Sequence, residues 1–315
     1  MESMLNIKDK LSVVITTYKR SKQLCRTLDF LENSPLKDCR ITILNNQSPD
    51  DTVEAFKPYA SKFPNIQMVT HPVNLGNGNA NYVHSINYCN TEYIWILSDD
   101  DVYDFSAFDD VAEEIMKGRA DVIHVGAHDD GEWNWGVYDT PKNLVKKGYR
   151  FFKYSSFWPC TIYKYSYMVR YIRDAYDYIH FWYSHFPALA AAYENDVPVY
   201  VSKRRVVKAV VGEQTYSYYI PVRGFVISSS YLSDNASKRA ICQAAFDNNH
   251  SLWYNAMDYS YRYRAEDDIV LVKHVLCKIL SPIERLAMRV CFLPYVVYRE
   301  CILLSRRIKN RKKGT

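Results

Sequence analysis

The sequence predicts an α/β fold with a mainly parallel sheet and helices on both faces. Over the first 125 residues, short β-branched runs alternate with segments whose apolar residues recur every three or four positions. The runs are apolar nearly throughout, as strands are when helices cover both faces of a sheet. Polar residues directly follow several of these runs. Alternation at this spacing is typical of βαβ units.

The expected elements follow one another in regular order. The expected strands are Leu11–Thr17, Arg40–Leu44, Ile66–Thr70, Tyr93–Leu97 and Val122–Val125. The expected helices between them are Ser21–Glu32, Asp50–Ser61, Asn79–Cys89 and Phe105–Lys117.

The composition is that of a packed globular protein and excludes collagen-like or largely disordered chains. The 315 residues are 48% hydrophobic and 24% charged, and the eight cysteines form no CxxC pair. This argues against a disulfide framework and for thiols in a reducing compartment. His124 and His128 have the spacing of zinc ligands on a helix, but they flank a strand end followed by Gly126, so we expect no zinc there.

No targeting or spanning segment is expected. The N-terminus lacks the basic start and apolar stretch of a signal peptide. No run reaches 18 apolar residues, and the longest near the C-terminus, Val290–Tyr298, has nine. We therefore expect a cytoplasmic protein that does not cross a membrane.

Three polar turns follow the first, second and fourth expected strands. They are TTYKR at residues 16–20, NNQS at 45–48 and SDDD at 98–101. Parallel sheets bind ligands at the carboxyl ends of their strands, so this edge is a suitable place for a nucleotide and a divalent cation. No GxGxxG or GxxxxGK[ST] motif follows the first strand, so neither a dinucleotide fold nor a P-loop ATPase is favoured.

The acidic triplet Asp99, Asp100 and Asp101 needs a cation, a basic partner or water to offset its repulsion. In an extended segment Asp99 and Asp101 could share one side, with Asp100 opposite. Their hard oxygens suit Mg²⁺ or Mn²⁺. The structural alternative is a solvated acidic turn before the helix that starts near Phe105.

The strings VVITTYKR, ILNNQSPDDT and NLGNGNANYVHSINYCNTEYIWILSDDD together resemble the nucleotide-sugar half of family 2 glycosyltransferases, which have the GT-A fold. The resemblance covers roughly residues 10–125 well and the rest weakly. It implies a GT-A domain with a nucleotide-sugar-binding half at residues 1–125 and an acceptor-binding half at 126–265. A basic amphipathic helical tail at 266–315 completes the chain.

By this resemblance the polar turns hold the donor. Most members have Asp where Asn45 and Asn46 stand, yet an amide can still pair with uracil because it both donates and accepts hydrogen bonds. The metal pair stays open between Asp99 with Asp101 and Asp100 with Asp101. Asn79 is a possible ligand contact or simply a helix-capping amide. The resemblance places on the nucleotide Thr17, Tyr18, Arg20, Asn46, Asn79, Asp99 and Asp100, and on Mn²⁺ or Mg²⁺ the carboxylates of Asp99 and Asp101.

The second half is expected to bind the acceptor and supply a base. Residues 131–183 are rich in aromatic side chains, which stack on sugar rings or simply pack a core; Trp133 and Trp135 lie in a polar loop and are the expected acceptor contacts.

In inverting members a carboxylate before a late helix deprotonates the acceptor. Counting back from Val199–Val201 puts His185 at that place, and its pKa near 6.5 suits the task. A helix N-terminal histidine is the alternative, and the rival bases are Asp177, His180, Asp129 and Asp130.

The tail carries the basic charge of the chain. The net charge is +5, and residues 273–315 hold eleven Lys and Arg against Glu284 and Glu300. The tail is expected to lie on the anionic inner face of the cell membrane or to dock on the catalytic domain. Pro282 and Pro294 are expected to divide it into two or three helices. No nucleic-acid partner is expected.

The resemblance implies an inverting, metal-dependent transfer of a sugar, UDP-linked in the first instance, to a hydroxyl of a glycan or lipid-linked glycan. Assembly of a surface polysaccharide such as capsule or O-antigen is the implied pathway. One alternative is a sugar nucleotidyltransferase, although TTYKRSKQ is not the glycine-rich phosphate loop such enzymes need. Another is a non-catalytic protein that binds glycans or nucleotide sugars.

Overall fold

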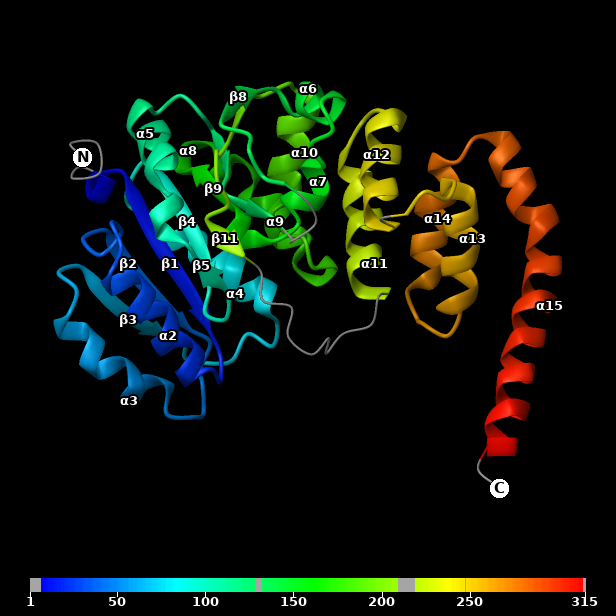
Figure 1. Ribbon diagram of the computed structural model, residues 1–315, viewed down its shortest axis with the longest axis horizontal. Helices are drawn as coiled ribbons and strands as arrows, with labels where there is room; N and C mark the ends of the chain where they lie inside the picture. Colours follow the sequence, from blue (N-terminus) through cyan, green and yellow to red (C-terminus); the bar gives the residue numbers. More distant parts are fainter. Residues whose placement is uncertain (1–6, 128–131, 209–218, 247, 314–315) are drawn as a thin grey trace. The chain divides into compact units, whose positions relative to one another are not determined.

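The computed structural model of the protein describes residues 7–127, 132–208, 219–246 and 248–313, with the side chains described up to residue 306. The chain forms two compact units, Met1–Thr215 and Tyr216–Thr315 (Figure 1). The expected division at residue 125 lies within the first unit, as the boundary between two halves of one domain does, and residues on both sides of it contribute strands to one sheet. The expected tail from residue 266 lies within the second unit, where the helices on both sides of 265 pack together.

The first unit contains one large and one small sheet. The strands of the large sheet are β1 (Leu11–Thr17), β2 (Arg40–Asn45), β3 (Ile66–Thr70), β4 (Tyr93–Ser98), β6 (Val122–His124), β8 (Val137–Asp139), β9 (Thr161–Lys164) and β10 (Val199–Val201). Their order is β3-β2-β1-β4-β9-β6-β10-β8. The first four pair in parallel, whereas β9 is antiparallel to both β4 and β6. The expected mainly parallel sheet is therefore confirmed, and every residue of β1 and β4 is buried.

The small sheet fixes the segment after the acidic triplet. It joins β5 (Val102–Tyr103), β11 (Val207–Lys208) and β7 (Gly126–Ala127) in the order β5-β11-β7. A Cβ added at Gly126 would lie 2.5 Å from the Val207 carbonyl oxygen. Only glycine therefore allows β7 to approach β11 this closely.

The expected helices of the first half are present within a few residues. The α-helices of the first unit are α2 (Ser21–Glu32), α3 (Thr52–Phe56), α4 (Gly78–Ser85), α5 (Asp109–Lys117), α6 (Pro141–Lys146), α7 (Phe151–Tyr154), α8 (Tyr165–Met168), α9 (Ile172–Asp177) and α10 (Phe186–Glu194). Tight 3₁₀ turns extend or connect them: η2 (Lys57–Ser61) follows α3, η3 (Ile86–Tyr88) follows α4, η4 (Phe105–Ala107) precedes α5, η5 (Trp158–Cys160) precedes β9 and η7 (Ile179–Phe181) follows α9. The apolar faces of α2 and α5 join one core cluster with the strands.

The second unit is helical. It comprises α11 (Tyr219–Ser228), α12 (Asn235–Phe246), α13 (Leu252–Arg262), α14 (Ile269–Ile279) and α15 (Pro282–Lys313). A basic helical C-terminal region is thus confirmed. None of the helices in the described part of the chain combines the length and apolar character needed to cross a bilayer.

The tail forms two helices, α14 and α15, within the expected two or three, and Pro282 begins the second of them, but the expected break at Pro294 is wrong. Pro294 lies inside the 32-residue helix α15. A proline in a helix interior costs about 3 kcal/mol, so contacts elsewhere must hold the helix together. Directly after it, Tyr295 donates a hydrogen bond to Asp258 of α13, and its ring lies 5.8 Å from that of Tyr261. These tertiary contacts override the local preference.

Asp110 joins α5 to β10 and gives a test of the fold. Its buried Oδ2 accepts hydrogen bonds from the Tyr200 hydroxyl and the Lys203 N–H, both at 2.7 Å. Asp110→Ala would leave both donors unpaired and should lower the free energy of unfolding by about 2–3 kcal/mol in urea denaturation. The exposed neighbour Asp109 is the control, and Asp109→Ala should change it by less than about 0.5 kcal/mol. Equal losses would contradict this role for Asp110.

Candidate functional site

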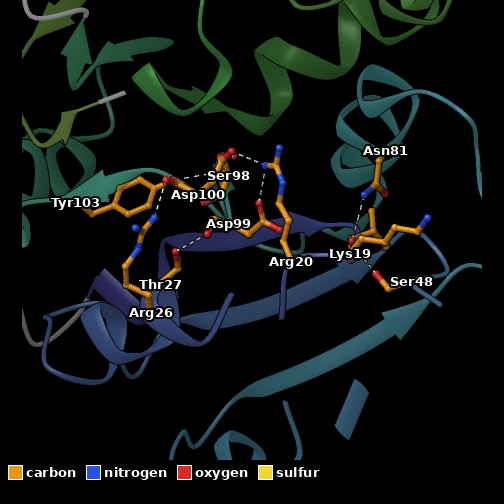
Figure 2. Close-up of polar contacts among 11 residues, drawn as sticks. Lys19, Arg20, Arg26, Thr27, Ser48, Asn81, Ser98, Asp99, Asp100 and Tyr103 are labelled. Carbon is orange, nitrogen blue, oxygen red and sulfur yellow. Dashed lines mark hydrogen bonds and ion pairs between the residues drawn. The ribbon is translucent and has the colours of Figure 1, made fainter. Parts of the chain in front are cut away.

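The three polar turns meet at one edge of the sheet. Thr16 lies in register with Ser98, and Thr17 with Asn45. The Asn46 N–H donates to the Thr17 carbonyl at 3.0 Å, and the Lys19 N–H donates to Ser48 Oγ at 3.0 Å (Figure 2). The predicted convergence of these segments is therefore present in the structure.

Both turns after β1 and β2 contain a non-glycine residue with left-handed backbone. Lys19 and Gln47 each have φ of 55°, a conformation that costs about 1–2 kcal/mol for an L-residue with a Cβ. Local bonds offset this cost: Asn45 Oδ1 accepts the Ser48 N–H at 3.0 Å, and the Gln47 side-chain amide donates to the Pro72 carbonyl at 2.9 Å. Strained backbone held in this way commonly occurs at ligand sites.

Arg20 is the basic partner of the acidic triplet in this structure. Its Nη1 lies 3.1 Å from Asp99 Oδ1 and also pairs with Asp100 (Figure 2). Asp100 in turn accepts a hydrogen bond from the Ser98 hydroxyl. The guanidinium lies between two carboxylates and is itself about half exposed, so it is accessible to an incoming anion.

The backbone of the acidic turn is held by residues of two elements, α2 and β5, for which the sequence predicted no role in the site. From α2, Thr27 Oγ1 donates to the Asp99 carbonyl at 3.0 Å and Arg26 Nη2 donates to the Asp100 carbonyl at 2.6 Å. From β5, the buried Tyr103 hydroxyl accepts the Ser98 N–H and donates to the Ser98 carbonyl. Arg26 and Thr27 follow the TTYKR turn closely, and Tyr103 lies two residues after the triplet. That nearby tyrosine is the one sign in the sequence that this turn has further support.

Two of the three carboxylates are buried. Asp99 and Asp101 are each 2% exposed, whereas Asp100 is partly exposed. Burial raises the pKa of Asp99 to about 6, although contacts with Thr17 and Arg20 act in the opposite direction. Asp99 Oδ2 has no hydrogen-bond partner among the described residues. A buried, unpaired carboxylate oxygen is a ligand atom that a hard cation would satisfy.

The residues present therefore fit a divalent cation that takes few ligands from the protein. Within the described residues, no group of three or more His, Cys, Asp or Glu side chains is arranged to hold a metal ion. Asp99 and Asp101 would supply two carboxylates, leaving other positions to a diphosphate and water, as Mg²⁺ sites often do.

The two predicted amides, Asn46 after β2 and Asn79 on α4, differ in availability. Asn46 Oδ1 accepts the Leu75 N–H at 2.9 Å, which leaves its Nδ2 and one lone pair of Oδ1 to meet a base. Asn79 is 4% exposed, and its Nδ2 has no partner among the described residues. Tyr18 is 38% exposed next to the same turn. Tyr82 of α4, which the sequence analysis missed, stacks on Trp158 with ring centroids 5.4 Å apart.

His185 does not have the surroundings of a base. It is completely buried directly before α10, and its Nε2 donates to the Ser155 carbonyl at 2.8 Å. The Trp158 ring lies 4.4 Å away, and burial lowers the pKa of His185 to about 3. An acceptor hydroxyl needs a base that it can reach. These contacts favour the alternative of a helix N-terminal packing residue.

Asp177 is the rival base with better access. It is exposed at the end of α9. The following turn η7 is attached to the segment before α4 by the Asn77 Nδ2 hydrogen bond to the Ile179 carbonyl, at 3.2 Å. Asp177 therefore belongs to a segment packed against α4, which carries Asn79. Asp129 and Asp130 lie outside the described residues, as does His128; His124 is buried and bonded to Tyr149.

The two predicted acceptor contacts belong to an aromatic cluster. The Trp133 indole N–H donates to the Ser202 carbonyl at 2.9 Å. The rings of Trp133 and Trp135 lie 5.9 Å and 4.9 Å from that of Tyr149. Both tryptophans are partly buried, so part of each ring is still available. Their contact with an acceptor stays a prediction.

Comparison with known proteins identifies the class. Residues 12–179 match the sequence model of glycosyl transferase family 2. The chain belongs to this family, and its class is that of the glycosyltransferases. The resemblance read from the three polar turns is confirmed.

The chain is similar to several named proteins. It is 29% identical over 133 residues to a dolichyl-phosphate beta-glucosyltransferase of Trichomonas vaginalis, covering 39% of this chain and 41% of that protein. It is 29% identical over 94 residues to the poly(ribitol-phosphate) beta-glucosyltransferase of Bacillus spizizenii, covering 29% and 15%. The chain thus spans less than half the length of these curated relatives.

The fold is also found among solved structures. The crystal structure of S. aureus TarS 1-349 in complex with UDP-GlcNAc superposes with a TM-score of 0.55 and 15% identity, covering 83% of this chain and 75% of that one. At this identity the likeness establishes the fold, and the GT-A class expected from the sequence is confirmed.

The buried carboxyl of Asp99 predicts a dependence of stability on pH. Its pKa is about 6 in the folded protein and 3.8 in a model peptide. Between about pH 4 and pH 6 the Asp99 carboxyl therefore stays protonated in the folded protein but loses its proton in the unfolded chain. The free energy of unfolding falls over this range by on the order of 2–3 kcal/mol. Asp99→Asn should raise the thermal midpoint at about pH 7.5 and have little effect at about pH 4. The control Asp109→Asn should show no such difference, and an equal effect of Asp99→Asn at both pH values would contradict the prediction.

Proposed function

We propose that this protein transfers a sugar from a nucleotide donor to a hydroxyl of a glycan or lipid-linked glycan. The proposed donor is a UDP-sugar. The observation that carries the proposal is the acidic turn, where Asp99 and Asp101 are buried beside Arg20 at the edge shared by the turns after β1 and β2. Membership of glycosyl transferase family 2 supports the reaction class. The TarS complex with UDP-GlcNAc supports UDP as the first nucleotide to test.

A divalent cation, Mn²⁺ or Mg²⁺, fits this site. Asp99 and Asp101 would hold it, and when bound it would offset the charge that develops on the diphosphate leaving group. Arg20 forms ion pairs with Asp99 and Asp100. When the donor binds, Arg20 would pair with its phosphate oxygens in place of these carboxylates. Thr17, Tyr18, Asn46 and Asn79 would line the nucleoside.

The transfer itself is a single displacement. The Asp177 carboxylate accepts the proton of the acceptor hydroxyl as the acceptor oxygen bonds to the anomeric carbon. The bond from that carbon to the diphosphate breaks, the nucleoside diphosphate leaves with the electron pair, and the configuration inverts. Trp133 and Trp135 would hold the acceptor. The relatives named for dolichyl phosphate and poly(ribitol phosphate) support a phosphate-linked acceptor of the kind used in surface polysaccharide assembly.

One observation favours a second candidate. His185 stands where a catalytic carboxylate is expected and is buried and neutral, which is compatible with a protein that binds nucleotide sugars without transferring them. The structure contains no feature in its described residues that favours a sugar nucleotidyltransferase over these two.

The donor site is tested by calorimetric binding of UDP, GDP and their common sugar conjugates, first with Mn²⁺ and then with chelator. We expect UDP compounds to bind with metal, and Asp101→Asn to weaken this binding at least about a hundredfold because a buried carboxylate ligand is lost. Asp109→Asn, at an exposed position on α5, is the matched control and should bind as the wild type does. Equal binding with Mn²⁺ and with chelator, or no binding by the folded protein, would contradict the donor site.

The base is tested by release of UDP from a UDP-sugar in the presence of acceptor. Asp177→Asn should reduce turnover about a hundredfold or more while leaving the donor dissociation constant unchanged. The control Asp38→Asn changes a carboxylate two residues before β2, away from the carboxyl ends of the strands, and should leave turnover unchanged.

His185→Gln separates a structural from a catalytic histidine. Because His185 is buried and bonded to the Ser155 carbonyl, the substitution should lower the thermal midpoint yet retain most turnover below that temperature. A folded His185→Gln protein with donor binding intact and turnover lost would return the role of base to His185.

A further inference from the structure

Exposed apolar side chains gather on the last helix. Among the residues whose side chains the structure describes, sixteen large hydrophobic residues are exposed, and nine of them lie on α15. Isolated exposed apolar residues are ordinary, but a concentration of this kind marks an interaction surface. The nine are Ile283, Leu286, Val290, Phe292, Leu293, Val297, Tyr298, Leu303 and Leu304.

Five of these residues form one stripe along the helix. They are separated by four, three, four and seven positions, which places them on a single face. Their exposure ranges from 55% to 70%. The stripe runs for about 27 Å at 1.5 Å per residue. We call it the outer stripe: Leu286, Val290, Leu293, Val297 and Leu304.

The outer stripe lies opposite the face that packs within the second unit. On that packed face, Tyr295 bonds Asp258 of α13, and Glu284 pairs with Arg239 of α12 at 2.7 Å. Glu284 and Tyr295 are about half a turn around the helix from Leu286 and Leu293, given 100° per residue. The helices of this unit thus cover one side of α15 and leave the five apolar residues of the stripe exposed, while Glu300, between Val297 and Leu304, reaches Tyr261 and Arg264 with its carboxylate.

The charge beside the stripe is basic. Arg285 and Arg289 are exposed next to Leu286 and Val290, and the sequence continues as RRIKNRKK after residue 305. The two acidic residues of the helix are already paired, Glu284 with Arg239 and Glu300 with Arg264. A second copy of this helix would bring like charges together, whereas an anionic surface would compensate them.

From these features we propose that α15 binds an anionic lipid bilayer, lying in the plane of its surface. The outer stripe enters the boundary between headgroups and acyl chains, and the arginines on its flank meet the lipid phosphates. Since no described helix can span the bilayer, the contact is interfacial. This goes beyond the proposed transfer reaction and does not depend on it, although it would bring the enzyme to a lipid-linked acceptor.

Flotation of the full chain with vesicles tests the proposal. We expect binding to phosphatidylcholine vesicles that contain phosphatidylglycerol, and little binding to phosphatidylcholine alone. The double variant Leu286→Gln/Leu293→Gln should reduce partitioning at least about tenfold, because two buried aliphatic contacts are lost. The matched control Val53→Gln/Val145→Gln changes two exposed valines of the first unit and should have no effect.

The charge contribution is tested separately. Arg285→Gln/Arg289→Gln should weaken binding to the anionic vesicles roughly thirtyfold, since each nearby base contributes about a factor of five. The charge-matched control Lys57→Gln/Lys117→Gln, at exposed positions on the first unit, should weaken it much less. Added salt should reproduce the effect of the arginine substitutions.

Two results would overturn the proposal, provided that circular dichroism shows the variants to be folded. One is equal binding to both kinds of vesicle that the outer-stripe substitutions leave unchanged. The other is the absence of vesicle binding together with a dimer, seen by sedimentation, that these substitutions dissociate, which would assign the stripe to a second copy. Calorimetric donor binding should be normal in every variant, so failure here is distinguishable from failure of the proposed transfer function.

Discussion

The candidate site depends on how the chain holds carboxylates at a buried edge. Asp99 and Asp101 are removed from water, and like charges in such a place are tolerated only when a partner offsets them. In this structure Arg20 has that role for Asp99 and Asp100. The pairing is exchangeable, because the guanidinium is half exposed, and a divalent cation on the carboxylates would offset their charge while Arg20 turned to a diphosphate. The site thus stores unfavourable charge that a ligand can relieve.

The positions of the carboxylates depend on backbone contacts rather than on the carboxylates themselves. Thr27 and Arg26 hold two carbonyls of the turn from α2, and Tyr103 holds Ser98 from β5. Helix α2 therefore packs on the core and also fixes the turn. Groups held in place before a ligand arrives need little reorganisation when charge develops on it, which is the main physical advantage of an enzyme site over water.

The sequence predicted the strands and helices of the first half of the chain well because its signals are local. Apolar runs of a fixed length and helical periodicity determine β1 and α2 to the residue, and the rule that parallel strands share their carboxyl ends brings the turns together. His185 was placed by counting along the chain, which carries no information about depth, and the structure buries it under Trp158. Pro294 was expected to end a helix because local preference ignores tertiary contacts such as that of Tyr295 with Asp258.

The second unit presents the opposite situation to the first. In the sheet, every residue of β1 and β4 is covered, so its apolar surface is satisfied within the unit. Helix α15 is apolar on two sides, one packed on α13 and one open at Leu286, Val290 and Leu293. An apolar face contributes to stability only when it is removed from water, so the second face of α15 contributes nothing while it stays exposed. The open face is bordered by Arg285 and Arg289, for which the described residues offer no ion-pair partner, so an environment that is both apolar and anionic would complete it, and a lipid surface combines the two.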